Sequence, residues 1–382
     1  MSDLTTTTPA HDLPWILERL QAAIALECST LPLYLSAMFS LEVQNNTAYT
    51  AIRSVAMEEM VHMAIAANIL SALGGSPSIA SLQFGYPVKG LPGGVEPDLE
   101  VGLASLSPPQ LRNFLRIEMP EFLLHKSDRG EEYPTIAKFY GEIRDVIVAN
   151  ETAIRAVMAA PVKANQVDDN IGFRAIKTTP TSDTFSQVLS GIDEILEQGE
   201  GSPTRSMFAG KGSEDESSHY NRFNELLYEH SYQDPVPLVE MTLKNESHFY
   251  TGRAIPFPPV VNTLAVPADG YAKVLAQDPD ATAVTVDLTA FDGAFSSILA
   301  ALDAVWNGDQ KASWKTLGGA VHSMVDLRVL SCFNLLRHQV PPKVVKRLPE
   351  LYTAKEVAFM GEYTDLNAPV FYGPRFFNTN AK

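Results

Sequence analysis

The fold is decided at residues 58–63, which read EEMVHM. They lie within an apolar pattern that recurs every three to four residues from Ile52 to Leu73, and this spacing predicts an amphipathic helix. Gly74-Gly75 then predicts the end of the helix. Glu59 falls on the apolar stripe, and His62 points to the same side three residues later. A buried carboxylate beside a buried imidazole requires a compensating partner.

The segment before this helix supplies a matching carboxylate. Residues 13–43 show the same helical spacing, and Glu27 falls in step with Leu20, Ile24 and Leu31. Only the short polar link 44–47 separates the two periodic segments, so they are expected to form an antiparallel helical hairpin. Pro32 interrupts the first helix pattern, either by bending a helix near a ligand or by starting a second helical piece capped by Ser29 or Thr30.

The rest of the chain predicts further helices joined by long connections. Residues 76–109 contain several prolines and a Gly-Gly pair, which predict a long crossover over the bundle. Helical spacing returns at residues 107–124, 134–159, 184–199 and 214–231, with a glycine-rich segment at 199–212.

The last third has a different composition. Residues 253–285 are rich in Pro and Asp and predict an irregular connector, with one short strand at residues 283–288. A helical pair at 289–307 and 311–338 is apolar enough to pack on the bundle. The predicted fold class is therefore all-α, a four-helix bundle with long crossover loops and an extra C-terminal helical pair. The predicted parts are a bundle at 12–250 and a connector with helical extension at 251–382.

A second Glu-x-x-His unit, Glu216 and His219, lies on a later apolar stripe. In dinuclear carboxylate bundles, one helix of a pair supplies a Glu and its partner supplies a Glu-x-x-His motif, and the bundle contains two such pairs. Oxygen-rich ligands with one imidazole per metal favour iron, with manganese second. The third helix offers Glu200 as the first candidate and Glu118 beside it. The predicted metal ligands are Glu27, Glu59, His62, Glu118, Glu200, Glu216 and His219.

Structural explanations compete with several of these assignments. Glu27 alone would fit an exposed helix charge, and Glu59 with His62 would fit a buried hydrogen-bonded pair. Ser213 three residues before Glu216 matches a capping box, which would use the carboxylate on backbone N–H groups. A helical scaffold that has kept the pattern without metal therefore stands as one hypothesis.

The charge and composition of the chain indicate which binding partners and which cellular location to expect. The formal net charge is −16, and no basic cluster offsets it, so nucleic acid and anionic membranes are not expected partners. No apolar run is expected to reach the roughly 18 residues of a membrane span, and the N-terminus lacks a signal pattern. Cys28 and Cys332 are the only cysteines, which fits a reducing, cytoplasmic location. A homo-oligomer is compatible with this composition.

Several ordered motifs resemble the ferritin-like iminophenyl-pyruvate dimer synthase family, over roughly residues 12–232. They are ECSTLPLYL at 27–35, EEMVHM at 58–63, GGSP at 74–77, LPGGV at 91–95, IEMPE at 117–121, EQGEG at 197–201 and HYNRF at 219–223. The resemblance implies a ferritin-like metal-binding bundle with the seven ligands named above and Glu197 in reserve.

The same resemblance carries the expectation of function. It implies a non-haem dinuclear metal oxidoreductase, with two iron ions, that uses dioxygen or peroxide on a small, aromatic or amino-acid-derived substrate. The alternative is a non-catalytic metal-binding or iron-handling protein. In the enzyme hypothesis Glu59 bridges the metals, and His62 and His219 each bind one of them.

Overall fold

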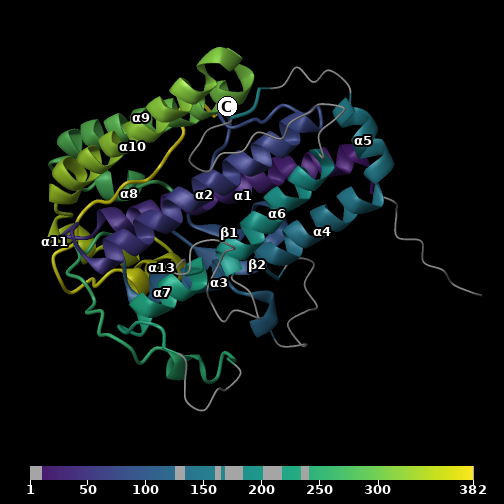
Figure 1. The fold of residues 1–382 in the computed structure, drawn as a ribbon. Helices are drawn as coiled ribbons and strands as arrows, with labels where there is room; N and C mark the ends of the chain where they lie inside the picture. Colours follow the sequence, from purple (N-terminus) through teal and green to yellow (C-terminus); the bar gives the residue numbers. More distant parts are fainter. Residues whose placement is uncertain are drawn as a thin grey trace, which may run out of the picture.

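The computed structural model describes residues 11–124, 134–159, 165–167, 184–200, 217–233 and 241–381. The long helices form the centre of the molecule, and a second pair of long helices lies across one side of it (Figure 1). The chain is mostly helical, as its sequence periodicity predicts. The described part contains one two-stranded sheet.

The first two helices form the predicted hairpin. Helix α1 spans Leu13–Phe39 and α2 spans Thr47–Ala72. The Asn46 side chain accepts a hydrogen bond from the Tyr49 backbone N–H at 2.8 Å and so caps α2. Gly74, with φ +84°, turns the chain after α2, and the Gly75 N–H bonds the Leu70 carbonyl at 2.9 Å. The glycine pair therefore ends α2 as its sequence predicts.

Pro32 lies inside α1, which is continuous on both sides of it. Ser29 and Thr30 are interior helix residues whose hydroxyls bond carbonyls three residues back. The prediction of a second helical piece capped by these residues is wrong. Instead, the Tyr86 hydroxyl donates to the Ser29 carbonyl at 2.5 Å, in the turn that the proline disturbs.

Four helices close into a bundle around this hairpin. Helix α4 spans Ile136–Ala149 and α6 spans Thr184–Glu200. Contacts run in a ring from α1 to α2, α6, α4 and back to α1. The core is built from side chains at helical spacing, such as Ile52, Phe139 and Ile192, all fully buried.

Shorter helices extend the bundle at its ends. Helix α5, Glu151–Ala159, follows α4 directly and packs on α6. Helices α3, Pro108–Ile117, and α7, His219–Leu227, pack against each other, and α7 also contacts α2 and α6. Figure 1 shows α3 and α7 together near one end of α2. This arrangement brings the residues after α3 and at the start of α7 to the interior of the bundle.

The crossover contains a hairpin that the sequence reading missed. Strands β1, Val88–Leu91, and β2, Val95–Val101, pair antiparallel. Gly93 and Gly94, at φ +80° and +83°, form the turn between them. A side chain at Gly93 would place its Cβ 2.7 Å from the Phe139 ring, so glycine also permits the hairpin to approach α4. The Gly-Gly pair was interpreted only as a helix breaker.

The C-terminal third corrects one prediction and extends another. Helix α9 spans Ala281–Asn307, so the short strand predicted at 283–288 is wrong. Val284, Leu288 and Phe291 keep helical spacing and are buried on one side, and this spacing overrides the β-branched residues between them. Helix α10, Ser313–Val329, follows and packs on α9. The remaining helices are α8 (Ala272–Leu275), α11 (Pro342–Val345), α12 (Leu348–Leu351) and α13 (Ala354–Tyr363).

Buried and half-buried polar side chains join this third to the bundle. The Asn68 side chain on α2 accepts from the Trp306 indole N–H at 2.9 Å and pairs with the Val167 backbone. Asp303 accepts the Ile79 backbone N–H at 2.8 Å. The division of the chain at residue 250 stays a prediction.

Asp292 on α9 fixes the C-terminal tail. Its Oδ2 accepts from both Nε and Nη2 of Arg375 at 2.7 Å, and its Oδ1 accepts the Phe377 N–H at 3.2 Å. Burial raises the pKa of Asp292, against the opposing effect of Arg375. The tail is therefore held by a carboxylate that is only 1% exposed.

Asp292→Asn is expected to lower the free energy of unfolding by about 2 to 4 kcal/mol, because removal of one partner leaves a largely buried guanidinium uncompensated. Asp326→Asn, an exposed position on α10, is the control and should change it by less than about 0.5 kcal/mol. Urea unfolding of the two variants beside the parent chain measures both. Equal stabilities for all three proteins would contradict the anchoring role.

Two helices are long and apolar enough to cross a membrane, contrary to the expectation from sequence. Windows in α1 and α9 each have a mean hydropathy of 1.4. The α1 window is 89% buried inside the protein, and the α9 window is 50% buried. The α1 pattern is therefore that of a core helix of the bundle.

Candidate metal centre

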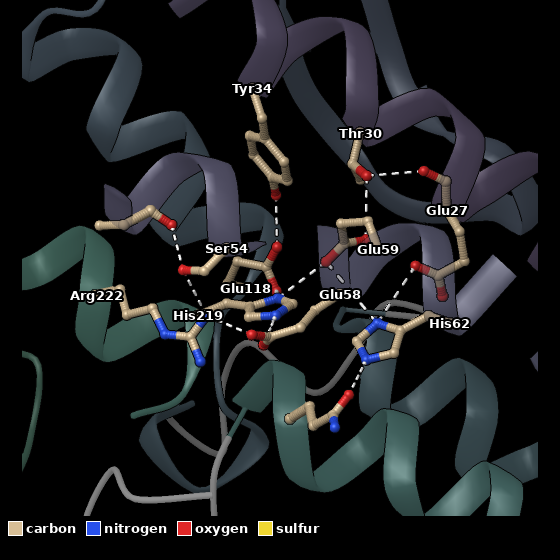
Figure 2. Close-up of polar contacts among 12 residues, drawn as sticks. Glu27, Thr30, Tyr34, Ser54, Glu58, Glu59, His62, Glu118, His219 and Arg222 are labelled. Carbon is tan, nitrogen blue, oxygen red and sulfur yellow. Dashed lines mark hydrogen bonds and ion pairs between the residues drawn. The ribbon is translucent and has the colours of Figure 1, made fainter. Parts of the chain in front are cut away.

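Two groups of carboxylate and imidazole side chains meet inside the bundle. Glu27, Glu59 and His62 form one group, and Glu59, Glu118 and His219 form the other. Within each group one ligand atom per residue lies within 4.8 Å of the others. Glu59 belongs to both groups, and Figure 2 shows it between His62 and Glu27 on one side and His219 and Glu118 on the other.

The secondary structure explains why these side chains meet. Glu27 comes from the middle of α1, and Glu59 and His62 come from one face of α2. Glu118 is the C-cap residue of α3, and His219 is the first residue of α7. All five side chains are buried, with at most 3% of each exposed. Because α3 and α7 pack together beside α2, their adjoining ends complete a cluster that the α1–α2 hairpin begins.

Each histidine is oriented by a polar partner on its far nitrogen. His62 Nε2 lies 2.8 Å from the Gln198 amide oxygen, so this nitrogen carries a proton and donates it. His219 Nε2 lies 2.9 Å from Glu58 Oε2 and donates in the same way. Glu58 in turn accepts from Arg222 at 2.8 Å. Both rings are thereby left with Nδ1 facing the carboxylates, which is the usual arrangement of a metal-binding histidine.

The Nδ1 atoms show how well the donor set fits a metal. His62 Nδ1 lies 3.9 Å from both Glu27 Oε2 and Glu59 Oε1, too far for a hydrogen bond. His219 Nδ1 lies 2.9 Å from Glu59 Oε1 and 3.3 Å from Glu118 Oε2, yet it makes no hydrogen bond of suitable direction within the described part of the chain. A buried imidazole nitrogen facing carboxylate oxygens is a donor set that divalent cations prefer. The residues present therefore fit a metal centre.

Hydroxyl groups hold the carboxylates from outside the cluster. Tyr140 on α4 donates to Glu27 Oε1 at 2.5 Å, and Tyr34 on α1 donates to Glu118 Oε1 at 2.5 Å. The Thr30 hydroxyl lies 3.1 Å from Glu59 Oε2 and 2.8 Å from the Glu27 carbonyl (Figure 2). These contacts fix one oxygen of each carboxylate, and they leave the other oxygen facing the histidines.

Aromatic rings close the cluster on the side of Glu118. Tyr34 packs edge-on against Phe114 at a centroid distance of 4.8 Å, and Phe223 packs against both rings at 5.3 Å and 5.1 Å. All three are fully buried. The carboxylates therefore lie against an apolar wall, where interactions between charges are strengthened.

The electrostatics of the metal-free cluster are unfavourable for its carboxylates. Burial raises the pKa of Glu27, and the nearby Glu59 carboxylate raises it further. Burial also raises the pKa of Glu118. Burial also acts to raise the pKa of Glu59, but the adjacent His219 ring outweighs this effect and lowers the pKa to about 2. Three buried carboxyl groups at close range thus need added positive charge, from protons or from metal ions.

The pKa values of the two histidines in the cluster are shifted in opposite directions. Burial lowers the pKa of His62, so its neutral form is favoured. Burial also acts to lower the pKa of His219, but the carboxylates of Glu118, Glu58 and Glu59 outweigh it and raise the pKa well above its ordinary value. In the metal-free protein the doubly protonated form of His219 is therefore favoured, and a cation bound at Nδ1 would replace the proton on that nitrogen.

Five of the seven residues predicted as ligands lie in the cluster. Glu216 lies outside the described residues, so its competing capping role with Ser213 is not described either. Glu200 ends α6, but its side chain also lies outside the described part. Glu118, named second to Glu200, lies in the cluster. The structure does not place Glu197, the reserve candidate, in either group.

The structure also decides between the competing explanations of two positions. Glu27 is 1% exposed, so it is not a solvent-exposed helix charge. Glu59 and His62 are 3.9 Å apart at their nearest named atoms, so they are not a directly hydrogen-bonded pair. His322 is exposed on α10 and belongs to neither group.

Sequence reasoning missed the residues that support the cluster. Glu58 was visible beside Glu59, but nothing in the pattern indicated that it would meet His219. Gln198 reaches His62 from the end of α6, next to Gly199, whose added Cβ would lie 3.6 Å from Glu118 Oε2. Tyr34 is seven residues after Glu27 and so on the same helix face, a signal that would have linked the two.

Comparisons with known proteins agree with the helical fold. A family model described as Ferritin-like matches residues 20–228, a little more than half of the chain. Among curated proteins no significant match is found. The crystal structure of a ferritin-like protein from Caulobacter vibrioides is similar, with a TM-score of 0.57 and 20% identity over 85% of this chain and 98% of that one. This likeness extends beyond residue 228, so part of the C-terminal third belongs to the shared fold.

Proposed function

This chain is a member of the ferritin-like family, and from that premise we propose that its buried cluster is a dinuclear metal centre of an oxidoreductase. The single observation that carries the proposal is that Glu59 is shared by two carboxylate–histidine groups. A shared carboxylate between two sets of donors is the arrangement that bridges two divalent cations.

The proposed ligands follow from the geometry. Glu27 and His62 would hold one metal, Glu118 and His219 would hold the other, and Glu59 would bridge them. Glu200 and Glu216 stay proposed additional ligands. Iron is proposed first and manganese second, because the donors are hard oxygens with one imidazole for each metal. Such a centre, when iron is bound, supplies electrons and open coordination positions for dioxygen or peroxide.

The protein's own residues would orient and shield this chemistry. Gln198 and Glu58 keep the protons of the two histidines on Nε2, away from the ligand atoms. The hydroxyls of Tyr34 and Tyr140 hold Glu118 and Glu27. The aromatic wall beside Glu118 excludes water, which protects reactive oxygen species from side reactions.

The proposed substrate is a small aromatic or amino-acid-derived molecule, supported by the resemblance of the motifs at residues 27–35, 58–63 and 117–121. Coupling two imino acids would remove two electrons and two protons. Dioxygen would accept them to form hydrogen peroxide, or hydrogen peroxide would accept them to form two water molecules. We further propose a cytoplasmic protein, because the only two cysteines, Cys28 and Cys332, are both free thiols. A homo-oligomer is proposed as its assembly.

The test combines oxygen uptake with product analysis. The chain is loaded anaerobically with Fe(II) and mixed with oxygen, with or without aromatic 2-imino acids generated in place by an amino-acid oxidase and followed by mass spectrometry. Repeated turnover with a coupled product, absent in Glu59→Gln, is the expected result. Oxygen uptake that stops once the iron is oxidised, with no product, would contradict the enzyme and leave an iron-handling protein.

Glu58→Ala is expected to weaken metal binding about 10- to 100-fold while the saturating metal content is unchanged, because His219 loses the partner that orients it. Glu246→Ala is the matched control. Glu246 accepts from Tyr220 and Tyr228 of the same helical region, but it has no contact with the cluster. Competition with a coloured chelator measures both affinities. An unchanged affinity in Glu58→Ala would contradict the orienting role.

A further inference from the structure

A cavity of about 460 Å³ lies between the α1–α2 hairpin and α10. Figure 1 shows α10 beside α9, on the side of α1 and α2 that faces away from α4 and α6. None of the five residues of the metal cluster lines this cavity. It is therefore a feature of its own, formed where the C-terminal third covers the bundle.

Most of the wall is apolar and adaptable. Leu31, Leu35 and Met38 come from α1, Met57 and Met60 from α2, and Met324 from α10. Methionine side chains are flexible and polarizable, so they adjust to ligands of different outline. The volume falls within the roughly 300 to 1,000 Å³ that is usual for small-molecule sites.

One end of the cavity is cationic. Arg328 on α10 donates from Nη1 to the Tyr49 hydroxyl at 3.1 Å, and Arg53 lies one helical turn from Tyr49 on α2. Both arginines line the cavity. Arg328 Nε is buried and makes no hydrogen bond within the described part of the chain. Neither arginine forms an ion pair with a described residue, although the chain carries 45 acidic residues.

We propose that this cavity binds a small amphipathic anion, with an apolar body between the leucines and methionines and one carboxylate at Arg53 and Arg328. Guanidinium groups match carboxylates in shape and charge, and a bound carboxylate would give the buried Arg328 Nε an acceptor. The ligand would enter as a free small molecule. The site does not depend on the metal centre, so it should bind in the metal-free protein and in Glu59→Gln.

Gly318 provides a way to block the cavity without disturbing the fold. It lines the cavity, and a Cβ built on it meets nothing within 4 Å. Gly319 is equally open and lies in the same helix, but it does not line the cavity. Leucine is a better helix former than glycine at both positions. Gly318→Leu is thus the blocking variant, and Gly319→Leu is its matched control.

The experiment titrates decanoate into the full chain and follows the heat of binding. Saturable binding of one decanoate per chain is expected in the parent protein and in Gly319→Leu, with affinity at least tenfold weaker in Gly318→Leu. Decyltrimethylammonium, which has the same tail and a cationic head, should bind at least tenfold more weakly than decanoate. Equal binding of the two amphiphiles, or equal binding by the two leucine variants, would overturn the proposal.

Arg328→Gln tests the charged end, with Arg112→Gln on α3, outside the cavity, as the control for net charge. At least a tenfold loss of decanoate affinity is expected in Arg328→Gln alone. Sedimentation of Gly318→Leu beside the parent chain distinguishes another occupant. A change of oligomeric state without any decanoate binding by the parent would show that a second copy of the chain covers the cavity, and would overturn the small-molecule proposal.

Discussion

Glu59→Gln is expected to abolish metal binding at both halves of the cluster. Glu59 supplies oxygens to both ligand groups, so the loss of its charge affects both metals at once. Glutamine keeps the shape of the side chain and can still form a hydrogen bond with the Thr30 hydroxyl, which lies 3.1 Å from Glu59 Oε2. The fold should therefore persist while the metal is lost. Metal content is measured by mass spectrometry on protein purified without chelator.

Two further variants test whether this loss of metal is specific to the shared position of Glu59. Glu118→Gln removes a ligand of one group only, so it is expected to retain about half of the metal of the parent chain. Glu225→Gln is the control, because Glu225 is a half-buried carboxylate on α7 that accepts the Tyr232 backbone N–H and lies in neither group. Full metal content in Glu59→Gln would contradict the bridging role. Equal losses in Glu225→Gln would show that the effect is not specific to the cluster.

Glu27→Gln is expected to stabilise the metal-free chain and to reduce the stabilisation that bound metal adds. In the metal-free protein the substitution removes a buried carboxyl group whose pKa is raised by burial and by Glu59, so it should stabilise the fold by about 1 to 3 kcal/mol at neutral pH. The substitution also removes a ligand, and a tenfold loss of affinity lowers the stabilisation that added metal provides by about 1.4 kcal/mol. Thermal unfolding with and without iron measures both effects.

The sign of the pH dependence follows from the raised pKa. The folded metal-free chain holds a proton on Glu27 where the unfolded chain has lost it, so stability falls as pH rises from the ordinary carboxyl pKa toward the raised one. The benefit of Glu27→Gln should therefore be absent below the ordinary pKa and complete above the raised one. The control Glu225→Gln should change the stability of the metal-free and the metal-loaded chain by the same amount. An increase in stability on adding iron that is as large in Glu27→Gln as in the parent chain would contradict the ligand role of Glu27.

The elements that sequence predicted best are those with long, regular periodicity. The α1–α2 hairpin and the burial of Glu27, Glu59 and His62 follow from one apolar stripe on each helix, because a charge on such a stripe must enter the core. The same reasoning placed His219 in phase with Phe223. Helical phase, a local property, was enough to indicate that these side chains face inward.

Features that depend on contacts between distant segments were beyond such reasoning. Glu118 was named second to Glu200, and its place beside His219 comes from the packing of α3 on α7. The contact of Glu58 with His219 spans 161 residues, and that of Gln198 with His62 spans 136. The segment 283–288 contains β-branched residues, yet it is helical because its buried side chains follow the helical spacing of α9.

The central claim is that two metals share Glu59, and anomalous X-ray scattering from crystals loaded with Fe(II) or Mn(II) tests it most directly. Two peaks are expected, one bounded by Glu27, Glu59 and His62 and the other by Glu59, Glu118 and His219, with the Glu59 carboxylate between them. A single peak, or no peak in this cluster while the metal binds elsewhere, would contradict it.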